Sequence, residues 1–447
     1  MATSNQQRAT SNSVKLVRTV GFWGLVAMCI NAVVGSGVFL LPSESYKLLG
    51  PFSLWAPLLF AVPVFILVLC FAEAASHFSE PGGAYLYART AFGDFIGFET
   101  GWMNWLARVT SLASLSNGFV VALARLFPTL AEPGPRAAVI IGSLFFLGAI
   151  HFVGVRYGAA SIYVFTFGKL VPLIGFIVVA LVAWRHNPLP GSLVLPGRGT
   201  NWNDAALFML FAYAGFENLG VPAGEYKNPR RDLPFALLVG TLAIAAIYVL
   251  AQLGAMSALP DLSRTDTPIA DAAAAIVGPL GAAIVTIGAV LSMAGTNSGT
   301  TLEGSRMLYA LSLDRRLGPL SYVHPRFRTP SVAIIIHVLF AMAVAVGGSF
   351  ATLALLSAVA RLATYLFTAA AIPWLRKLGG SFRVPGGPLV AILGVLWSLL
   401  LVYNLDEQKL WLAAVAVLVG ALIYVLSRPG AAIAPAVEHE RTTTDIA

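Results

Sequence analysis

Long apolar runs separated by short polar segments repeat along almost the whole chain. An apolar helix of about 20 residues crosses the roughly 30 Å hydrocarbon core of a bilayer. Twelve candidate runs cover 20–41, 52–78, 95–126, 137–153, 158–184, 203–224, 234–257, 276–311, 331–346, 351–375, 388–403 and 409–426. The pattern therefore predicts an all-α, polytopic membrane protein with about twelve transmembrane helices.

Composition supports a lipid environment. Of the 447 residues, 58% are apolar and 11% are charged, whereas a typical soluble domain has about 25% charged residues. The mean hydropathy is +0.80. The 28 Lys and Arg exceed the 20 Asp and Glu, but in a membrane protein the placement of basic residues indicates orientation rather than nucleic-acid binding. We therefore expect a lipid bilayer as the surroundings and no nucleic-acid partner.

The basic residues are distributed unequally between the two sides of the predicted membrane. With the N-terminus in the cytoplasm, 18 of the 28 Lys and Arg fall in cytoplasmic segments and seven fall outside. The remaining three lie within apolar runs and are Arg108, Lys169 and Arg361. The positive-inside rule then predicts a multi-pass protein of the cell membrane (plasma or inner) with two cytoplasmic tails. The predicted tails are 1–18 and 427–447, and the membrane domain is 19–426.

Two of the apolar runs contain residues that interrupt a helix. The first run has Gly35, Ser36 and Gly37 in mid-span, and the sixth has Gly215 close to the ionisable Glu217. A glycine costs a helix about 1 kcal/mol relative to alanine, and a serine can bond its own backbone instead of continuing the helix. Glycines also permit close helix packing in membranes, which is the alternative explanation for either position alone.

The positions of the two interruptions indicate an internal repeat. They lie five helices apart, so the two segments cross the membrane in opposite directions. This pattern is typical of an inverted repeat with a substrate site where both helices unwind. The predicted repeats are about 19–184 and about 203–375, followed by two further helices over about 388–426.

A pair of unwound helices offers partial charges of both signs. Free backbone N–H groups at the start of a half-helix suit a carboxylate, and free carbonyl groups at the end of a half-helix suit an ammonium group. The amides concerned belong to Gly35, Ser36 and Gly37, and the carbonyls to Val33, Phe211, Ala212 and Ala214. Because an α-amino acid carries both charged groups, it fits the two breaks better than a sugar or an inorganic ion.

Several motifs, in order along the chain, resemble those of the amino acid–polyamine–organocation (APC) transporters. They are the two interrupted segments, Pro81–Tyr85, Glu225–Pro234, Ser305–Ala310 and His324–Pro330. The resemblance extends from about Val20 to Leu426. It implies a leucine-transporter-like fold, a 5+5 inverted repeat with broken helices 1 and 6, that moves amino acids by alternating access. It also implies that the seven break residues named above bind the substrate, with the Phe211 ring as a gate.

Lys169 lies too deep in the fifth run for its ammonium group to reach the membrane surface. At 1.5 Å per residue it is about 16 Å into a core of about 30 Å, so it must find partners or lose its proton. In sodium-independent APC transporters a helix-5 lysine stands in for the sodium ion between helices 1 and 8, and Lys169 resembles that residue. The expected partners are carbonyls near Asn31–Val34 and hydroxyls of helix 8, such as Ser298 or Thr301. A lysine held for structure alone is the alternative.

Glu217 directly follows the second break. By resemblance to APC exchangers of cationic substrates, it is a possible proton sensor or a residue that favours a basic substrate. The alternative is a buried carboxyl group that caps the second half-helix. Arg108, Arg361, Glu73 and Glu303 are expected to have structural or gating roles, and the sequence does not assign their pairs.

No pattern in the chain indicates catalysis. The six histidines lack metal-ligand spacing, and no nucleophile elbow or phosphate loop occurs, so we expect no enzyme, no metal and no cofactor. The expected function is that of a permease: a sodium-independent, proton-coupled symport of amino acids, with neutral amino acids as the favoured substrates. The alternative is an exchanger of cationic amino acids or polyamines, argued from Glu217.

Overall fold

The computed structural model describes residues 20–78, 82–154, 158–183, 196–197, 200–220, 226–315 and 317–427, with backbone only for 158–164 and 314. Within these ranges the regular structure is helical, apart from one isolated β-bridge between Val20 and Tyr226. The predicted N-terminal tail and the predicted C-terminal tail beyond Ser427 lie outside the described residues, as do Pro81 and Glu225 of the family motifs.

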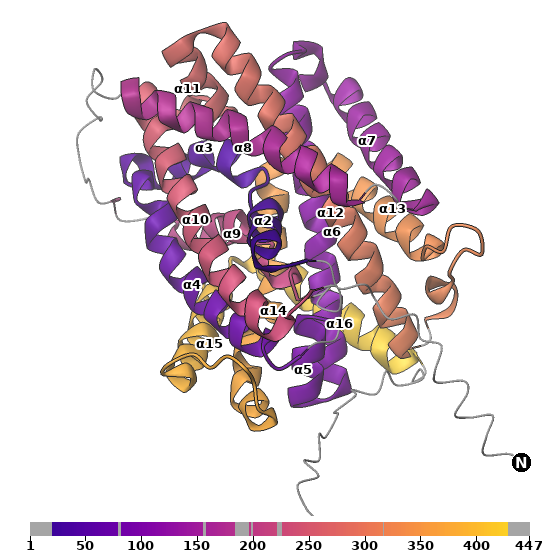
Figure 1. The fold of residues 1–447 in the computed structure, drawn as a ribbon. Helices are drawn as coiled ribbons and strands as arrows, with labels where there is room; N and C mark the ends of the chain where they lie inside the picture. Colours follow the sequence, from indigo (N-terminus) through magenta and orange to yellow (C-terminus); the bar gives the residue numbers. More distant parts are fainter. Residues whose placement is uncertain are drawn as a thin grey trace, which may run out of the picture.

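Each predicted apolar run corresponds to a helix or to a broken helix (Figure 1). The helices are α2 (Phe22–Val33), α3 (Gly37–Leu49), α4 (Ala56–Ala75), α5 (Ala84–Phe92), α6 (Asp94–Ala124), α7 (Pro133–Val153), α8 (Gly158–Ala183), α9 (Trp202–Tyr213), α10 (Pro229–Ala258), α11 (Pro268–Val277), α12 (Pro279–Arg315), α13 (Ser331–Gly347), α14 (Phe350–Leu375), α15 (Gly387–Tyr403) and α16 (Glu407–Leu426). The helices α5 and α11 were not predicted, because nine and ten residues are too few for a transmembrane signal.

The lengths of the helices account for the expected membrane crossings. Among the described residues, eight helices are long and apolar enough to cross a membrane, and the pair α2–α3, bent by 45° at its break, makes a ninth crossing. The helices α13 and α15 have 17 residues each, and α9 is followed after its break by a 3-10 helix over Phe216–Asn218. By length and composition the described residues thus hold eight or nine crossings, and the twelve predicted runs include these three shorter helices. The prediction of an all-α polytopic membrane protein is confirmed.

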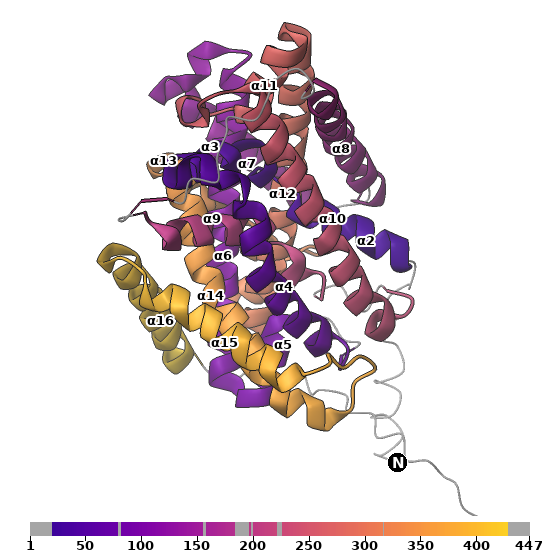
Figure 2. The same cartoon turned by 90° about the vertical axis from the view of Figure 1, so that its left-hand side faces the viewer.

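The helices differ in how much of their surface the rest of the protein covers. Over its most apolar stretch α6 is 72% buried, whereas α7 is 22% and α16 is 6% buried. Large apolar side chains of the last two point outward, among them Phe145, Phe146 and Leu426. Figure 2 shows α15 and α16 on one flank of the bundle, away from α8. These apolar outer surfaces suit lipid tails, and α6 is a central helix of the bundle.

The packing of the helices has the internal symmetry of two corresponding halves. The first five crossings are α2–α3, α4, α6, α7 and α8, and the second five are α9, α10, α12, α13 and α14. If each crossing of the first half corresponds to the crossing at the same place in the second half, every helix–helix contact should have an equivalent contact between the corresponding helices. The contact of α6 with α14 converts into that of α12 with α8, and the contact of α2 with α10 converts into that of α9 with α4. All of these contacts are present, and α15 and α16 follow the repeat as the two predicted additional helices.

Candidate functional site

The first break lies between α2 and α3, where Val34, Gly35 and Ser36 are not helical. The backbone N–H groups of Gly35, Ser36 and Gly37 have no hydrogen-bond acceptor among the described residues. The Ser36 hydroxyl is buried and likewise has no partner in this part of the chain. Because these donors lie at the N-terminus of α3, they form a cluster of the kind that binds anions.

The second break follows the end of α9 at Tyr213. Ala214 is extended, and Gly215 has φ +128°, a conformation that favours glycine. A Cβ atom at Gly215 would lie 2.6 Å from the Ala32 carbonyl oxygen of α2. A Cβ atom at Gly37 lies 3.0 Å from the Ala212 Cα atom of α9. The glycines therefore allow the two broken helices to touch at two points.

The hydroxyl group of Tyr248 in α10 bonds to the backbone of both broken helices. The Tyr248 hydroxyl lies 2.7 Å from the Ala212 carbonyl oxygen and 3.2 Å from that of Val33. The Phe211 carbonyl accepts a hydrogen bond from the Ala214 N–H at 3.2 Å. Each carbonyl oxygen has a second lone pair for a further donor. Sequence reasoning missed Tyr248, because a single tyrosine in an apolar run carries no pattern that relates it to either break.

Lys169 of α8 is fully buried against the end of α2. Its ammonium group donates to the carbonyl oxygens of Asn31 and Val34, both at 2.7 Å. The Ser292 hydroxyl of α12 lies 3.2 Å from the Val34 carbonyl oxygen and 3.1 Å from that of Gly35. No carboxylate pairs with Lys169 in the described part of the chain. Lys169 and Ser292 thus tie α8 and α12 to the first break.

Among the described residues Lys169 bonds to no hydroxyl of α12; the Ser292 hydroxyl instead donates to the Val34 carbonyl that Lys169 also bonds. Ser298 Oγ lies 3.1 Å from His151 Nε2, and Thr301 Oγ1 donates to the Asn297 carbonyl at 2.8 Å. Both residues are more than one helical turn beyond Ser292, about 9 Å or more along the axis, so they lie away from the end of α2. The prediction of carbonyl partners near Asn31–Val34 agrees with these contacts, and the prediction of Ser298 or Thr301 as partners is wrong.

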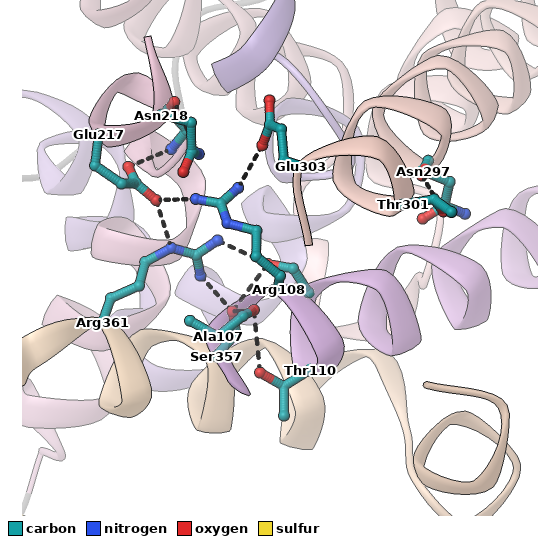
Figure 3. Close-up of polar contacts among 12 residues, drawn as sticks. Ala107, Arg108, Thr110, Glu217, Asn218, Asn297, Thr301, Glu303, Ser357 and Arg361 are labelled. Carbon is teal, nitrogen blue, oxygen red and sulfur yellow. Dashed lines mark hydrogen bonds and ion pairs between the residues drawn. The ribbon is translucent and has the colours of Figure 1, made fainter. Parts of the chain in front are cut away.

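Glu217 is enclosed by four hydrogen-bond donors, of which Figure 3 labels the guanidinium groups of Arg108 and Arg361. Its Oε1 atom accepts from Arg108 Nη2 at 2.6 Å and from Arg361 Nε at 2.9 Å. Its Oε2 atom accepts from the Gly215 N–H at 2.8 Å and from the Tyr365 hydroxyl at 3.3 Å. The carboxylate therefore holds the second break to α6 and α14, in the capping geometry that the sequence left as one alternative.

The two other glutamates singled out in the sequence, Glu303 and Glu73, belong to different groups: Glu303 joins the Glu217 group through Arg108, and Glu73 does not. Arg108 Nη1 donates to Glu303 Oε2 at 3.0 Å, as Figure 3 shows. Glu73 instead pairs with Arg376, whose Nη2 atom lies 2.9 Å from Glu73 Oε2. Sequence reasoning could not assign these pairs, because they join residues that are more than a hundred positions apart.

A cavity of about 30 Å³ lies between the two breaks. All seven residues predicted to bind a substrate line it: Val33, Gly35, Ser36, Gly37, Phe211, Ala212 and Ala214. Arg108 and Arg361 line it as well, a placement that the sequence did not predict. The Arg361 guanidinium carbon lies 6.0 Å from the centre of the Phe211 ring. Lys169 and Glu217 are not among the lining residues; they bond to backbone groups of the two breaks instead.

An inverted repeat of membrane helices, broken at the first and sixth crossings around a cavity, defines a secondary transporter. The chain belongs to the amino acid permease family, whose family model matches residues 20–426.

Two similar proteins come from Bacillus subtilis. The serine/threonine exchanger SteT is 30% identical over 339 residues, which cover 73% of this chain and 76% of the relative. The branched-chain amino acid permease BcaP is 28% identical over 445 residues, which cover 94% of each chain. The family and these relatives are transporters of amino acids rather than enzymes.

Proposed function

We propose that the protein moves amino acids across the cell membrane by alternating access, with both termini on the cytoplasmic side. The observation that supports this most strongly is the cavity between the breaks, because backbone donors and backbone carbonyls line the same space. The carboxylate and ammonium groups of an amino acid are joined through one carbon atom, so one molecule can meet both. In this proposal the three amides of the first break bind the carboxylate, the predicted carbonyls bind the ammonium group, and the Phe211 ring closes over the substrate.

The position of Lys169 supports transport that needs no sodium. Its ammonium group holds the carbonyl oxygens of α2 that a cation between α2 and α12 would otherwise hold. A covalently attached cation at this place removes the need for a dissolved one. We therefore propose that uptake continues when sodium is replaced by choline.

We further propose that Lys169 couples transport to protons. A lysine can release its proton in one conformation and take it up in another, and among the described residues no carboxylate fixes its charge. Glu217 as a proton sensor stays a prediction from the sequence. Its four donors favour the capping role, because each of them stabilises the ionised carboxylate.

The charges around the cavity favour neutral substrates over cationic ones. Glu217 accepts from Arg108 and Arg361, so the carboxylate on which the cationic alternative rested is already neutralised. The two guanidinium groups line the cavity and would repel a basic side chain. One relative is named for serine and threonine and the other for branched-chain amino acids, so similarity to them does not indicate whether the substrate side chain is polar or apolar.

Uptake into proteoliposomes tests the proposal directly. A panel of radiolabelled amino acids is offered with and without an inward proton gradient, in sodium and in choline buffers. We expect saturable uptake and counterflow of neutral amino acids, faster uptake with the proton gradient, and equal rates in the two buffers. The absence of saturable uptake for every amino acid would contradict amino acid transport. A steep sodium dependence would contradict only the role of Lys169.

A further inference from the structure

The part of the cavity wall that comes from intact helices is polar. Six residues of α6, α12 and α14 line the cavity, and five of them are polar: Arg108, Ser111, Thr296, Thr300 and Arg361. Leu115 is the apolar exception. Since the breaks contribute the backbone groups, this wall is where the side chain of a bound amino acid lies. A wall of this composition is unusual for an apolar side chain, because small-molecule sites are mostly apolar with a few polar groups that set specificity.

The two arginines are not fully satisfied by the protein. An arginine has five N–H donors. Arg361 donates from Nε to Glu217, from Nη2 to Ser111 and from Nη1 to Ser357. Arg108 donates from Nη2 to Glu217 and from Nη1 to Glu303.

The Nε–H group of Arg108 is buried and has no acceptor among the described residues. The Arg108 side chain is 5% exposed, so bulk water does not replace the missing acceptor. Native proteins leave few buried donors in this state, and each one needs an explanation. Glu217 cannot supply the acceptor, since each of its two oxygens already accepts two hydrogen bonds, one of them from Arg108 Nη2. An acceptor on a molecule in the cavity can.

We propose that Arg108, supported by Arg361, selects amino acids whose side chain carries an oxygen that accepts a hydrogen bond. This inference rests on the proposed transport function and names the substrate class of the same cavity. A hydroxyl, amide or carboxylate side chain supplies the acceptor that Arg108 lacks. An apolar side chain of the same shape would take the guanidinium groups out of water and return no hydrogen bond. A cationic side chain would also meet two like charges.

The discrimination between isosteric substrates follows from this geometry. A hydrophobic pocket prefers the methyl group over the hydroxyl by about 10²-fold, whereas a site built to bond a substrate hydroxyl prefers the hydroxyl and rejects the analogue that lacks it by about 10⁴-fold or more. The sign of the preference therefore separates the two kinds of site. Threonine and valine form such a pair, and so do asparagine and leucine. We expect kcat/KM for threonine to exceed that for valine by at least about 100-fold, with the same direction for asparagine over leucine. Aspartate beside asparagine shows whether a charged or a neutral oxygen is preferred.

The variant Arg108→Lys tests the residue itself. Lysine keeps a positive charge for Glu217 and Glu303 but lacks the planar fork and the Nε–H group. We expect the threonine/valine ratio of kcat/KM to fall at least tenfold, through a higher KM for threonine. The control is Arg376→Lys, another arginine paired with a glutamate but outside the cavity, and its ratio should equal that of the unmodified protein.

The possible outcomes distinguish the substrate class, the role of Arg108 and the proposed function. Saturable uptake with threonine and valine handled equally overturns the inference and leaves the proposed function in place. An unchanged ratio in an active Arg108→Lys protein overturns the role of Arg108. If that variant does not fold, the isosteric ratios of the unmodified protein still decide the substrate class, and competition by asparagine and leucine repeats the comparison. Absence of uptake for every amino acid overturns both the inference and the proposed function.

Discussion

Replacing Lys169 with methionine tests the bridge between α8, α2 and α12. Methionine keeps an unbranched stem of similar length and removes the ammonium group, so the change isolates charge from packing. The ammonium group makes two hydrogen bonds at 2.7 Å to buried carbonyls. A hydrogen bond to a charged group contributes about 1.5–3 kcal/mol, so the bridge contributes about 3–6 kcal/mol in the conformation described.

This energy acts on one conformation of the transport cycle more than on others, because the bridge depends on where α2 ends relative to α8. At 1.36 kcal/mol per tenfold, losing about 3 kcal/mol from one state shifts the balance between states by on the order of 100-fold. We expect the initial rate of uptake to fall by a similar factor. Substrate should still raise the melting temperature of the variant, because the residues that line the cavity remain.

The assay is uptake into proteoliposomes together with thermal unfolding in detergent. Lys47→Met is a matched control, since Lys47 pairs with Glu44 at 2.9 Å in a partly exposed position far along α3 from the break. Uptake by Lys47→Met should change less than twofold, because an exposed ion pair contributes little to the stability of a protein. Near-normal, proton-driven uptake by Lys169→Met would refute the reasoning, and the coupling site would then have to be sought at Glu217.

Three further changes test the geometry of the site and of the scaffold. Gly215→Ala should reduce uptake more than tenfold and lower the melting temperature, because its Cβ atom would lie 2.6 Å from the Ala32 carbonyl oxygen; normal uptake would mean that the break does not need this close approach. Gly37→Val should abolish thermal stabilisation by substrate in a protein that remains monodisperse. The control Gly35→Ala, whose added Cβ atom has its nearest contacts 3.4 Å away, should retain most of that stabilisation. Equal effects of the two changes would count against the close contact at Gly37. Arg376→Met should destabilise the protein by about 3–5 kcal/mol, because it leaves the buried Glu73 carboxylate without its partner, and an unchanged denaturation midpoint would contradict this.

The sequence predicts the crossings and both breaks because each has a local cause. A bilayer requires about 20 apolar residues per helix, and the local clusters Gly35–Ser36–Gly37 and Gly215–Glu217 lower helix propensity at one point of an apolar run. These features depend on composition and position along one helix. The depth of Lys169 predicts only that its ammonium group needs buried partners; the carbonyls near Asn31–Val34 were expected from the family resemblance, and the expected hydroxyl partners were wrong.

Contacts between side chains of different helices could not be predicted from the sequence. The pair of Arg108 with Glu217 joins α6 to the second break, and the pair of Arg361 with Glu217 adds α14. Nothing local distinguishes these pairs from other combinations of the same four charges. The Tyr248 hydroxyl and the Ser292 hydroxyl are also placed by packing, since each reaches a break on another helix. The same limit applies to the cavity wall, which is why the two arginines that line it were expected to have structural or gating roles.

The covalent attachment of the Lys169 ammonium group has an electrical consequence. A dissolved coupling ion crosses the membrane in every cycle and adds its charge to the current, but a side chain can only shift within the field and then return. Moving one elementary charge through 100 mV is worth about 2.3 kcal/mol, and the membrane potential can deliver this work only through charges that cross completely. If transport is coupled to protons as proposed, those charges are protons for a zwitterionic substrate. The steady current, divided by the Faraday constant and the molar substrate flux, should then equal the number of protons moved per amino acid.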